Sequence, residues 1–318
     1  MTTTTKFRVA TLYDKDYVLD LCKNTFSWGD YIDRVWDIWI REPNSIFLVA
    51  VNENNIEKPI AIAHGIIIPE KIVWIEGIRV DPKYRSQKLA TNMSLHILDY
   101  ARKKGALYSS AIVSLNNDAS KGLMEKLGFK MISKWTYISI KPIVFPDVDN
   151  AIAYHSSKVA KLSEYQQILN FLNQPDIFKL ARKKFVNSWR WHDLTEDRLK
   201  KMINNKQVII VDNNYNNNNR KDNDDDDKKG DKIRGIAIID KDGYWNNPNI
   251  FQIIYIHAYS DEILFSLVIK CLELISSKEN KYERVQIFSP SPIKDNSLLF
   301  QKFDNNFSEQ FLLYHKEI

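Results

Sequence analysis

The sequence has few cysteines and lacks any long apolar run, and both shortages exclude classes of protein. Cys22 and Cys271 lie far apart in apolar, helix-like segments, so we expect two buried free thiols in a reducing compartment. No Cys-x-x-Cys or other Cys/His spacing indicates a metal site. No apolar run approaches the ~20 residues that span a bilayer, and the polar residues 1–5 lack the apolar core of a signal peptide. We therefore expect a soluble, cytoplasmic protein without a metal or a membrane partner.

A large excess of charge of one sign is also missing. The 45 basic and 40 acidic residues leave a net charge of +5, which gives no argument for a nucleic-acid partner. With 44% hydrophobic and 27% charged residues, the chain has the composition of a globular protein. Its 318 residues exceed one typical hydrophobic core and indicate two domains.

The most informative stretch is residues 73–104, which predicts a strand, a tight loop and a helix. β-Branched and aromatic residues over 73–80 favour a strand, and Asp81-Pro82 ends it because proline cannot donate a ladder hydrogen bond. From Leu89 onward, apolar residues recur at helical spacing. The basic turn at 85–88 leads into the helix N-terminus, where free backbone N–H groups and the helix dipole attract an anion such as a pyrophosphate. The alternative is an ordinary connection with solvated basic side chains.

This loop resembles motif A of the GNAT superfamily of N-acetyltransferases, Arg/Gln-x-x-Gly-x-Gly/Ala, which follows a strand often ending Val-x-Pro. Arg85 and Ala90 fit the motif, and Val80-Asp81-Pro82 precedes it. Lys88 stands where the family prefers glycine, and Ser86 stands where a glycine often follows the arginine. Glycine at such places lets the backbone approach the phosphates and accept an unusual φ.

A second stretch, residues 116–129 (NNDASKGLMEKLGF), is similar to the family's later motif, an asparagine followed by a helix ending Tyr-Glu-Lys-Leu-Gly-Phe. Asn117 matches the asparagine, and Met124 occupies the place where many members carry a tyrosine general acid. The two motifs occur in family order over roughly residues 6–141. The resemblance implies the acyl-CoA N-acyltransferase fold, a mixed central α/β sheet flanked by helices, and acetyl-CoA as the co-substrate.

Glu76 is the candidate catalytic residue. Regular alternation along the strand places it on one face with Trp74, Ile78 and Val80, and places Arg79 on the opposite face. Apolar neighbours raise the pKa of a carboxyl group towards neutral pH, where a general base works best. The alternative is a structural carboxylate paired with Arg79 or another basic residue.

The resemblance also implies where the co-substrate and the acceptor bind. The strand backbone would pair with the pantetheine arm, the loop and helix start would hold the pyrophosphate, and an asparagine would lie near the co-substrate. The implied residues are Ile78, Arg79, Val80, Arg85, Ser86, Gln87, Lys88, Leu89, Ala90 and Asn117. Asp30 and Tyr31 are expected to contact the substrate, with helix capping as the alternative for Tyr31. His64 either lines the acceptor cleft or is a satisfied core residue.

The resemblance implies acetyl transfer from acetyl-CoA to a primary amine of a small molecule such as an amino acid, by direct attack. The pattern of residues 29–32, 41–43 and 76–80 is similar to that of histidine N-acetyltransferases, which also carry a second domain. Because Met124 occupies the place of the tyrosine, the CoA thiolate would have to be protonated by water or by another tyrosine, such as Tyr108 or Tyr137. Two alternatives stay open: a non-catalytic acyl-CoA-binding or regulatory module, and a protein N-acetyltransferase.

The expected domains are an acetyltransferase domain over residues 1–148 and a second domain over 149–318. The second half repeats the order of strands and helices, but residues 258–261 leave no room for a pyrophosphate loop. We therefore expect a degenerate second copy of the fold, with an unrelated α/β lobe as the alternative. A helical run is expected from Pro175 to Phe185.

The low-complexity stretch at residues 213–232 cannot offset the entropy of ordering and predicts a disordered hairpin insertion in the second domain. Its four aspartates, at 224–227, fit a solvated acidic run better than a cation site.

Overall fold

The computed structural model describes residues 5–23, 25, 30–53, 55–141, 157–212, 233–240, 247, 249–276, 282–294, 297–303 and 307–318. The expected insertion at 213–232 and the expected domain boundary at 148–149 lie outside these residues. The chain forms two compact units. Unit 1 is Met1–Ile132 with Leu313–Ile318, and unit 2 is Ser133–Leu312. These units differ from the predicted domains at two places: the prediction assigns residues 133–148 to the first domain and residues 313–318 to the second.

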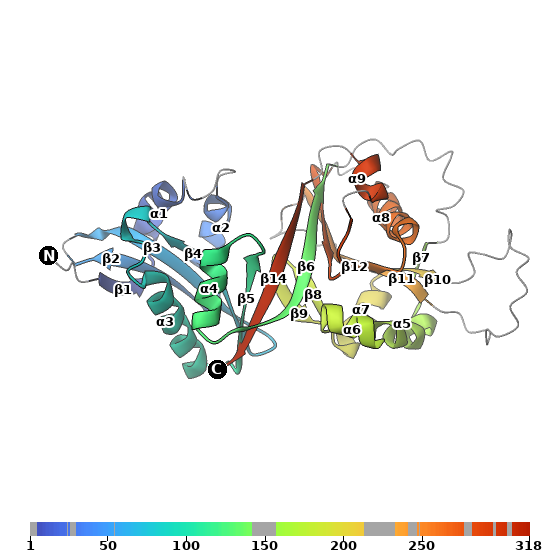
Figure 1. The fold of residues 1–318 in the computed structure, drawn as a ribbon, viewed down its shortest axis with the longest axis horizontal. Coiled ribbons are helices and arrows are strands. Elements are labelled where there is room, and N and C mark those ends of the chain that lie inside the picture. Colours follow the sequence, from blue (N-terminus) through green and yellow to red (C-terminus); the bar gives the residue numbers. More distant parts are fainter. Residues whose placement is uncertain are drawn as a thin grey trace, which may run out of the picture. The chain divides into compact units, whose positions relative to one another are not determined.

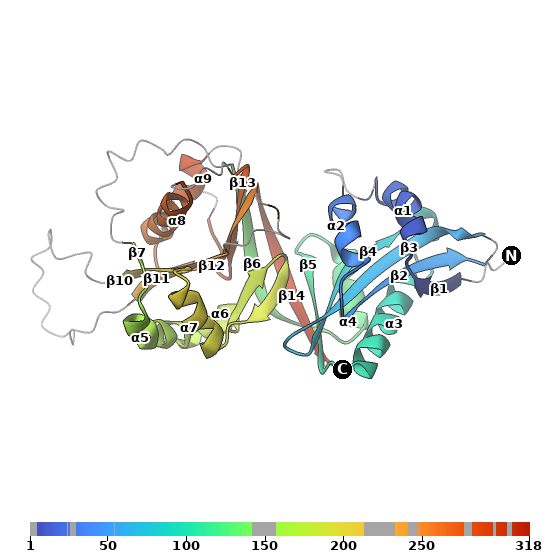
Figure 2. The same ribbon diagram turned by 180° about the vertical axis from the view of Figure 1, so that it is seen from behind.

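Unit 1 is a mixed sheet with helices on both faces (Figures 1 and 2). Its elements are β1 (Thr5–Val9), α1 (Lys15–Cys22), α2 (Ile32–Trp39), β2 (Ser45–Asn52), β3 (Asn55–Ile68), β4 (Ile72–Val80), α3 (Leu89–Lys103), β5 (Tyr108–Ser114), α4 (Asp118–Lys126), the beginning of β6 (Lys130–Ile140) and the end of β14 (Phe307–Glu317). Strands β1 to β4 are antiparallel neighbours in chain order, and β5 lies parallel to β4. This is the mixed α/β sheet flanked by helices that the sequence predicts.

The two faces of this sheet are covered by different helices. Helix α2 buries Ile32, Val35, Trp36 and Trp39, which recur at helical spacing and are at most 1% exposed. It lies on the same face as α1, and α3 covers the opposite face (Figures 1 and 2). A side chain at Gly65 would meet Ile97 of α3 at 2.3 Å, so the glycine permits close packing of α3 on β3.

The end of the chain forms part of unit 1. Strand β14 follows β5 in the order of the sheet, and the Ser110 Oγ and His315 Nδ1 atoms are 2.8 Å apart. The backbone N–H of Ile318 donates to the carbonyl oxygen of Leu107 at 3.0 Å. Because unit 1 includes these C-terminal residues, every experiment below uses the full chain.

Unit 2 contains a further set of paired strands, parallel and antiparallel, with its own helices. Its elements are the rest of β6, β7 (Lys158–Val159), α5 (Tyr165–Leu172), α6 (Pro175–Ala181), β8 (Lys184–Asn187), β9 (Arg190–Asp193), α7 (Glu196–Asn204), β10 (Val208–Asp212), β11 (Ile233–Asp240), β12 (Ile250–Ala258), α8 (Asp261–Ser276), β13 (Arg284–Ser289), α9 (Leu298–Lys302) and the first part of β14. Strands β7, β10, β11 and β12 pair antiparallel in this order, and β13 lies parallel to β12.

Helix α8 covers one face of these paired strands, and α5, α6 and α7 lie on the other (Figures 1 and 2). The expected helix to Phe185 ends at Ala181, and the hairpin of β8 and β9 follows it. Both cysteines are buried free thiols, as predicted. Among the described residues, none of the helices combines the length and the apolar character needed to cross a membrane.

Candidate functional site

Strand β4 carries the candidate catalytic residue and departs from regular alternation at Gly77. His64 of β3 is opposite Glu76, and Ile62 is opposite Arg79. Between these pairs β3 advances by two residues and β4 by three, which is a β-bulge. Gly77 has a φ of +65°, and a Cβ atom there would lie 2.5 Å from the Trp39 ring. Only glycine fits this position without strain.

The bulge overturns the prediction that Glu76 and Arg79 point to opposite faces. Ile62 and His64 are two residues apart on β3 and therefore share a face. Their partners Arg79 and Glu76 share that face too, because the extra residue in β4 reverses the alternation beyond it. The face is the one covered by α2, since Trp39 stacks on the His64 ring.

Arg79 forms a buried ion pair with Asp30. Its Nε atom donates to Asp30 Oδ2 at 2.7 Å and its Nη2 atom to Oδ1 at 3.1 Å. The side chains of Arg79 and Asp30 are 9% and 5% exposed. Burial acts to lower the pKa of Arg79, but interactions with Tyr31 and Asp30 raise it above its ordinary value. Arg79 is therefore a permanent cation fixed beneath α2.

Asp30 also organises the beginning of α2. Its Oδ1 atom accepts hydrogen bonds from the backbone N–H groups of Tyr31, at 2.7 Å, and Ile32, at 3.3 Å. The guanidinium carbon of Arg79 lies 5.3 Å from the centroid of the Tyr31 ring, and burial raises the pKa of the Tyr31 hydroxyl. Both Asp30 oxygens thus bind protein groups, and substrate contact by Asp30 and Tyr31 stays a prediction.

Glu76 is joined to His64 and Glu42 in a polar group on the same face. His64 is fully buried, and its Nδ1 atom lies 3.0 Å from Glu76 Oε1. When Glu76 is ionised, Nδ1–H is the donor of this hydrogen bond. His64 Nε2 lies 3.7 Å from Glu42 Oε2, too long for a hydrogen bond. The Glu76 and Glu42 side chains are 10% and 15% exposed, so both are partly accessible to solvent.

Aromatic rings hold His64 in place. The Trp39 ring is stacked on His64 with centroids 4.4 Å apart and planes 3° apart. Phe47 meets the same imidazole edge-on at 5.6 Å. The potential ligand atoms of Glu42, His64 and Glu76 lie within 4.8 Å of one another, so these residues have the composition of a divalent-metal site. Sequence reasoning assigned no site role to Glu42 or Trp39. Trp39 is the last residue of α2 and belongs to its buried face, and Glu42 lies in the segment between α2 and β2.

The loop that leads into α3 has the backbone that the motif requires, built without glycine. Ser86 has a φ of +63° and Lys88 a φ of +60°, in the left-handed region. These are the two positions where the related motif favours glycine. Lys88 occupies the N-cap position of α3 and makes no side-chain capping bond. The first N–H groups of this 15-residue helix are therefore available to an anion.

Glycine at these two positions should stabilise the protein. A residue with a Cβ atom is strained in the left-handed region and glycine is not. We expect Ser86→Gly and Lys88→Gly each to raise the free energy of unfolding by roughly 0.5–1 kcal/mol, measured by urea denaturation. Gln87→Gly is the control, because Gln87 is not among the residues with positive φ. Equal effects of all three changes would contradict the explanation.

Strands β4 and β5 separate where the candidate site begins. Their parallel pairing joins Ile72–Trp74 to Tyr108–Ser110, and residues 76–80 extend beyond it. The backbone of Ile78 to Val80 thus has a side not used by this pairing, and the co-substrate arm is predicted to lie there. Tyr108 is opposite Ile72, the first residue of β4 and four positions before Glu76 along the strand, so it is poorly placed as the acid. Tyr137 belongs to unit 2.

Helix α4 places the last two residues of the predicted site. Asn117 caps it, because its Oδ1 atom accepts a hydrogen bond from Ser120 N at 3.0 Å. A role of Asn117 near the co-substrate stays a prediction. Met124 is buried, with 2% exposed, and packs as an ordinary core residue of this helix.

Residues 9–129 match the model of a family described as the acetyltransferase (GNAT) family. No curated protein matches the chain. The chain is similar in structure to a GCN5-related N-acetyltransferase from Sphaerobacter thermophilus, with a TM-score of 0.57, 10% identity and coverage of 98% of this chain and 95% of that one. It is also similar to a candidate acetyltransferase from Thermoplasma acidophilum, with a TM-score of 0.52, 13% identity and coverage of 98% and 100%. At these identities the likeness shows a shared fold.

Proposed function

We propose that residues 9–129, which match the model of the acetyltransferase (GNAT) family, form a domain that transfers an acetyl group from acetyl-CoA to the primary amine of a small molecule such as an amino acid. The observation that carries this proposal is the Glu76–His64 hydrogen bond of 3.0 Å on the bulged strand β4. It provides a carboxylate held in one orientation, partly desolvated and beside the predicted path of the co-substrate.

Each residue of the group has a stated part in this reaction. Glu76 accepts the proton of the acceptor ammonium, directly or through a water molecule, so that the neutral amine attacks. His64 is a positioning residue, because its Nδ1–H fixes the Glu76 carboxylate. Glu76 and Glu42 place two carboxylates beside His64, and their negative charge would attract a cationic acceptor.

Acetyl-CoA fits the residues that the loop and β4 present. The uncapped N-terminus of α3 faces an exposed loop with the side chains of Arg85 and Lys88, which matches the charge of a pyrophosphate. The side of Ile78 to Val80 that does not pair with β5 offers backbone groups to the amides of a pantetheine arm, although the carbonyl oxygens of Ile78 and Val80 also accept hydrogen bonds from Arg79 Nη1, at 3.0 Å, and Arg85 Nε, at 3.4 Å. When bound, acetyl-CoA supplies an acetyl group activated as a thioester. With a buried methionine at position 124, water is the proposed source of the proton that the CoA thiolate takes up.

Charge reversal in the loop should weaken acetyl-CoA binding. We expect the double change Arg85→Glu and Lys88→Glu to raise the dissociation constant at least about tenfold, because it replaces attraction of the phosphates by repulsion. The control is Lys103→Glu with Lys104→Glu, at the opposite end of α3, which should change it little. Calorimetry with the full chain measures both. Equal losses in the two variants would indicate a general charge effect and no pyrophosphate site.

The acceptor class is tested by a panel of amines. We expect the full chain to turn over acetyl-CoA with free amino acids, polyamines or aminoglycosides. Turnover with peptide N-termini alone would favour the second candidate, a protein N-acetyltransferase. Binding of acetyl-CoA without turnover of any amine would favour the third candidate, a non-catalytic binding module. The departures from the family motifs at Lys88 and Met124 support this candidate.

We further propose that unit 2 is a degenerate copy of the same fold. Supporting this is the repeated pairing: three antiparallel pairs and then one parallel pair, through β1 to β5 in unit 1 and through β7, β10, β11, β12 and β13 in unit 2. In unit 2 only Tyr259 and Ser260 separate β12 from α8. This connection is too short for a pyrophosphate loop.

A further inference from the structure

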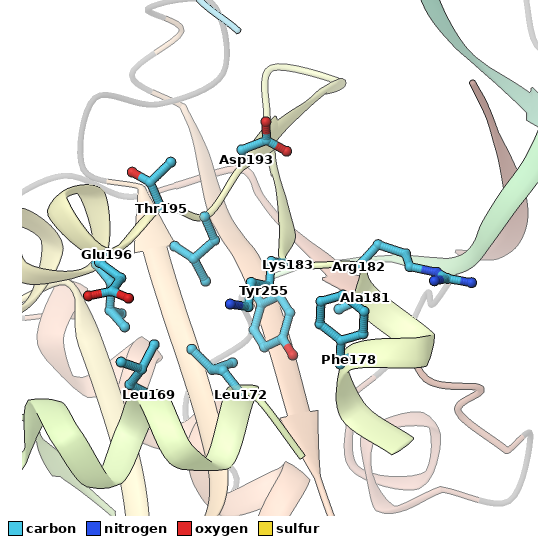
Figure 3. A pocket seen from close by; sticks show the side chains of 12 residues that line it. Leu169, Leu172, Phe178, Ala181, Arg182, Lys183, Asp193, Thr195, Glu196 and Tyr255 are labelled. Atoms are coloured by element: carbon cyan, nitrogen blue, oxygen red, sulfur yellow. The ribbon is translucent and has the colours of Figure 1, made fainter. Parts of the chain in front are cut away.

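Unit 2 contains a pocket of about 400 Å³ over β12 (Figure 3). This volume is in the range of small-molecule sites. Its walls come from α5, α6, the end of β9 and α7, and its floor is Tyr255 of β12. The lining residues are Leu169, Leu172, Phe178, Ala181, Arg182, Lys183, Asp193, Leu194, Thr195, Glu196, Leu199 and Tyr255. In unit 2, β12 has the place that β4 has in unit 1, between an antiparallel and a parallel neighbour.

The hydroxyl group of Tyr255 lacks a hydrogen-bond partner among the described residues. The residue is 0% exposed, and its ring meets Trp135 edge-on at 6.2 Å. Burial raises the pKa of this phenol, so it is neutral and can donate. In Figure 3 the ring faces the space that the pocket residues line. An unpaired buried hydroxyl is unfavourable, and a bound molecule with an acceptor atom would satisfy it.

Among the charged residues around the pocket, one lysine is placed to bind an anion. Asp193 already pairs with Lys184, with Oδ1 and Nζ 2.5 Å apart, and Glu196 accepts a hydrogen bond from the Tyr165 hydroxyl at 2.8 Å. Lys183 forms no ion pair with a described residue, and its ammonium lies 6.0 Å from the Phe178 ring centroid. Arg182 extends away from the Tyr255 ring (Figure 3). Lys183 is thus the cation available to a ligand.

We propose that this pocket binds a small organic carboxylate with an apolar body. The apolar part contacts Leu169, Leu172 and Phe178, the carboxylate faces Lys183, and an acceptor atom of the ligand receives the Tyr255 hydroxyl proton in a hydrogen bond. The site is separate from the acetyltransferase site, because all its lining residues belong to unit 2. The proposal therefore does not depend on the function proposed for unit 1.

The test uses phenylacetate and 4-methylpentanoate as probes, with their uncharged amides as matched ligands. Calorimetry and thermal shift of the full chain should show that the carboxylates bind at least tenfold more tightly than the amides. Lys183→Gln should remove this preference, and Tyr255→Phe should weaken both probes about three- to tenfold. Lys179→Gln, an exposed lysine of α6 outside the lining, is the control and should change neither.

Three results would overturn the proposal. One is that neither probe binds at millimolar concentration, and another is that the amides bind as well as the acids. The third is a lower melting temperature of ligand-free Tyr255→Phe, because the hydroxyl would then already be satisfied by internal water. Acetyl-CoA affinity, measured on the same variants, should equal that of the parent, so failure of this site is distinguishable from failure of the acetyltransferase site.

Discussion

Glu76→Gln should lower the rate of acetyl transfer by about 10²- to 10⁴-fold, the usual effect of removing a general base. The amide keeps the shape of the side chain and its place beside His64, but it cannot accept the ammonium proton. The variant should bind acetyl-CoA about as tightly as the parent, because Glu76 is absent from the loop predicted to hold the pyrophosphate. Its residual rate should lose the parent's rise with pH. Steady-state kinetics across pH and calorimetry with acetyl-CoA measure these effects.

The control for this variant is Glu57→Gln, an exposed glutamate of β3 in the same unit, which should leave rate and pH profile unchanged. A parental rate for Glu76→Gln over the whole pH range would make Glu76 structural. The base would then be His64, Asp30 or water alone. Loss of acetyl-CoA binding by Glu76→Gln would instead indicate that the change disturbs β4.

Asp30→Ala should destabilise unit 1 by about 3–5 kcal/mol, because it removes the carboxylate that balances the charge of the buried Arg79 guanidinium. The two side chains are only 5% and 9% exposed, so water cannot replace the lost bonds. The double variant Asp30→Leu with Arg79→Met removes both charges and should recover most of the loss. Urea denaturation of the full chain measures all three proteins.

The matched control is the exposed ion pair of Lys15 and Asp37, whose side chains are 37% and 56% exposed. Asp37→Ala should change stability little, because solvent screens this pair. If Asp30→Ala is as mild as the control but raises KM for the amine, Asp30 contacts the substrate as the sequence first indicated. Its bonds to Arg79 would then be secondary.

The strand, loop and helix over residues 73–104 could be predicted from sequence because each depends on local chemistry. β-Branched residues, Asp81-Pro82 and a helical stripe from Leu89 act within a few positions of one another. The left-handed φ of Ser86 and Lys88 agrees with the glycine preference of the related motif. Here the glycine preference of the family motif indicated a left-handed backbone, which the residue types serine and lysine do not indicate.

The bulge at Gly77 could not be predicted from the alternation of residues 72–80. It places different side chains at the candidate site from those that regular alternation predicts. The extra residue depends on packing against Trp39, 38 positions earlier, and it moves Arg79 onto the face of Glu76. The hairpin of β8 and β9 was missed for a related reason. Its turn residues Ser188 and Trp189 have φ of 47° and 65°, without the Asn-Gly signal typical of such turns.

Long-range pairing was also beyond sequence reasoning. Residues 313–318 join unit 1 through contacts such as Ser110 with His315, about 200 positions apart. Glu42 lies near His64 because Trp39 of α2 stacks on the His64 ring and β2, which follows Glu42, pairs with β3. The role of the second unit and the identity of the amine depend on such distant contacts. The pocket over β12 provides a ligand-binding test for the role of the second unit.

The central claim is that this chain acetylates an amine, and one measurement tests it most directly. The full chain is incubated with acetyl-CoA and a mixture of free amino acids and polyamines, and both free CoA thiol and N-acetylated product are quantified by mass spectrometry. We predict equal amounts of thiol and acetylated amine, both strongly reduced in Glu76→Gln. Thiol release that is independent of amine, or acetyl-CoA binding with neither product, would contradict the account.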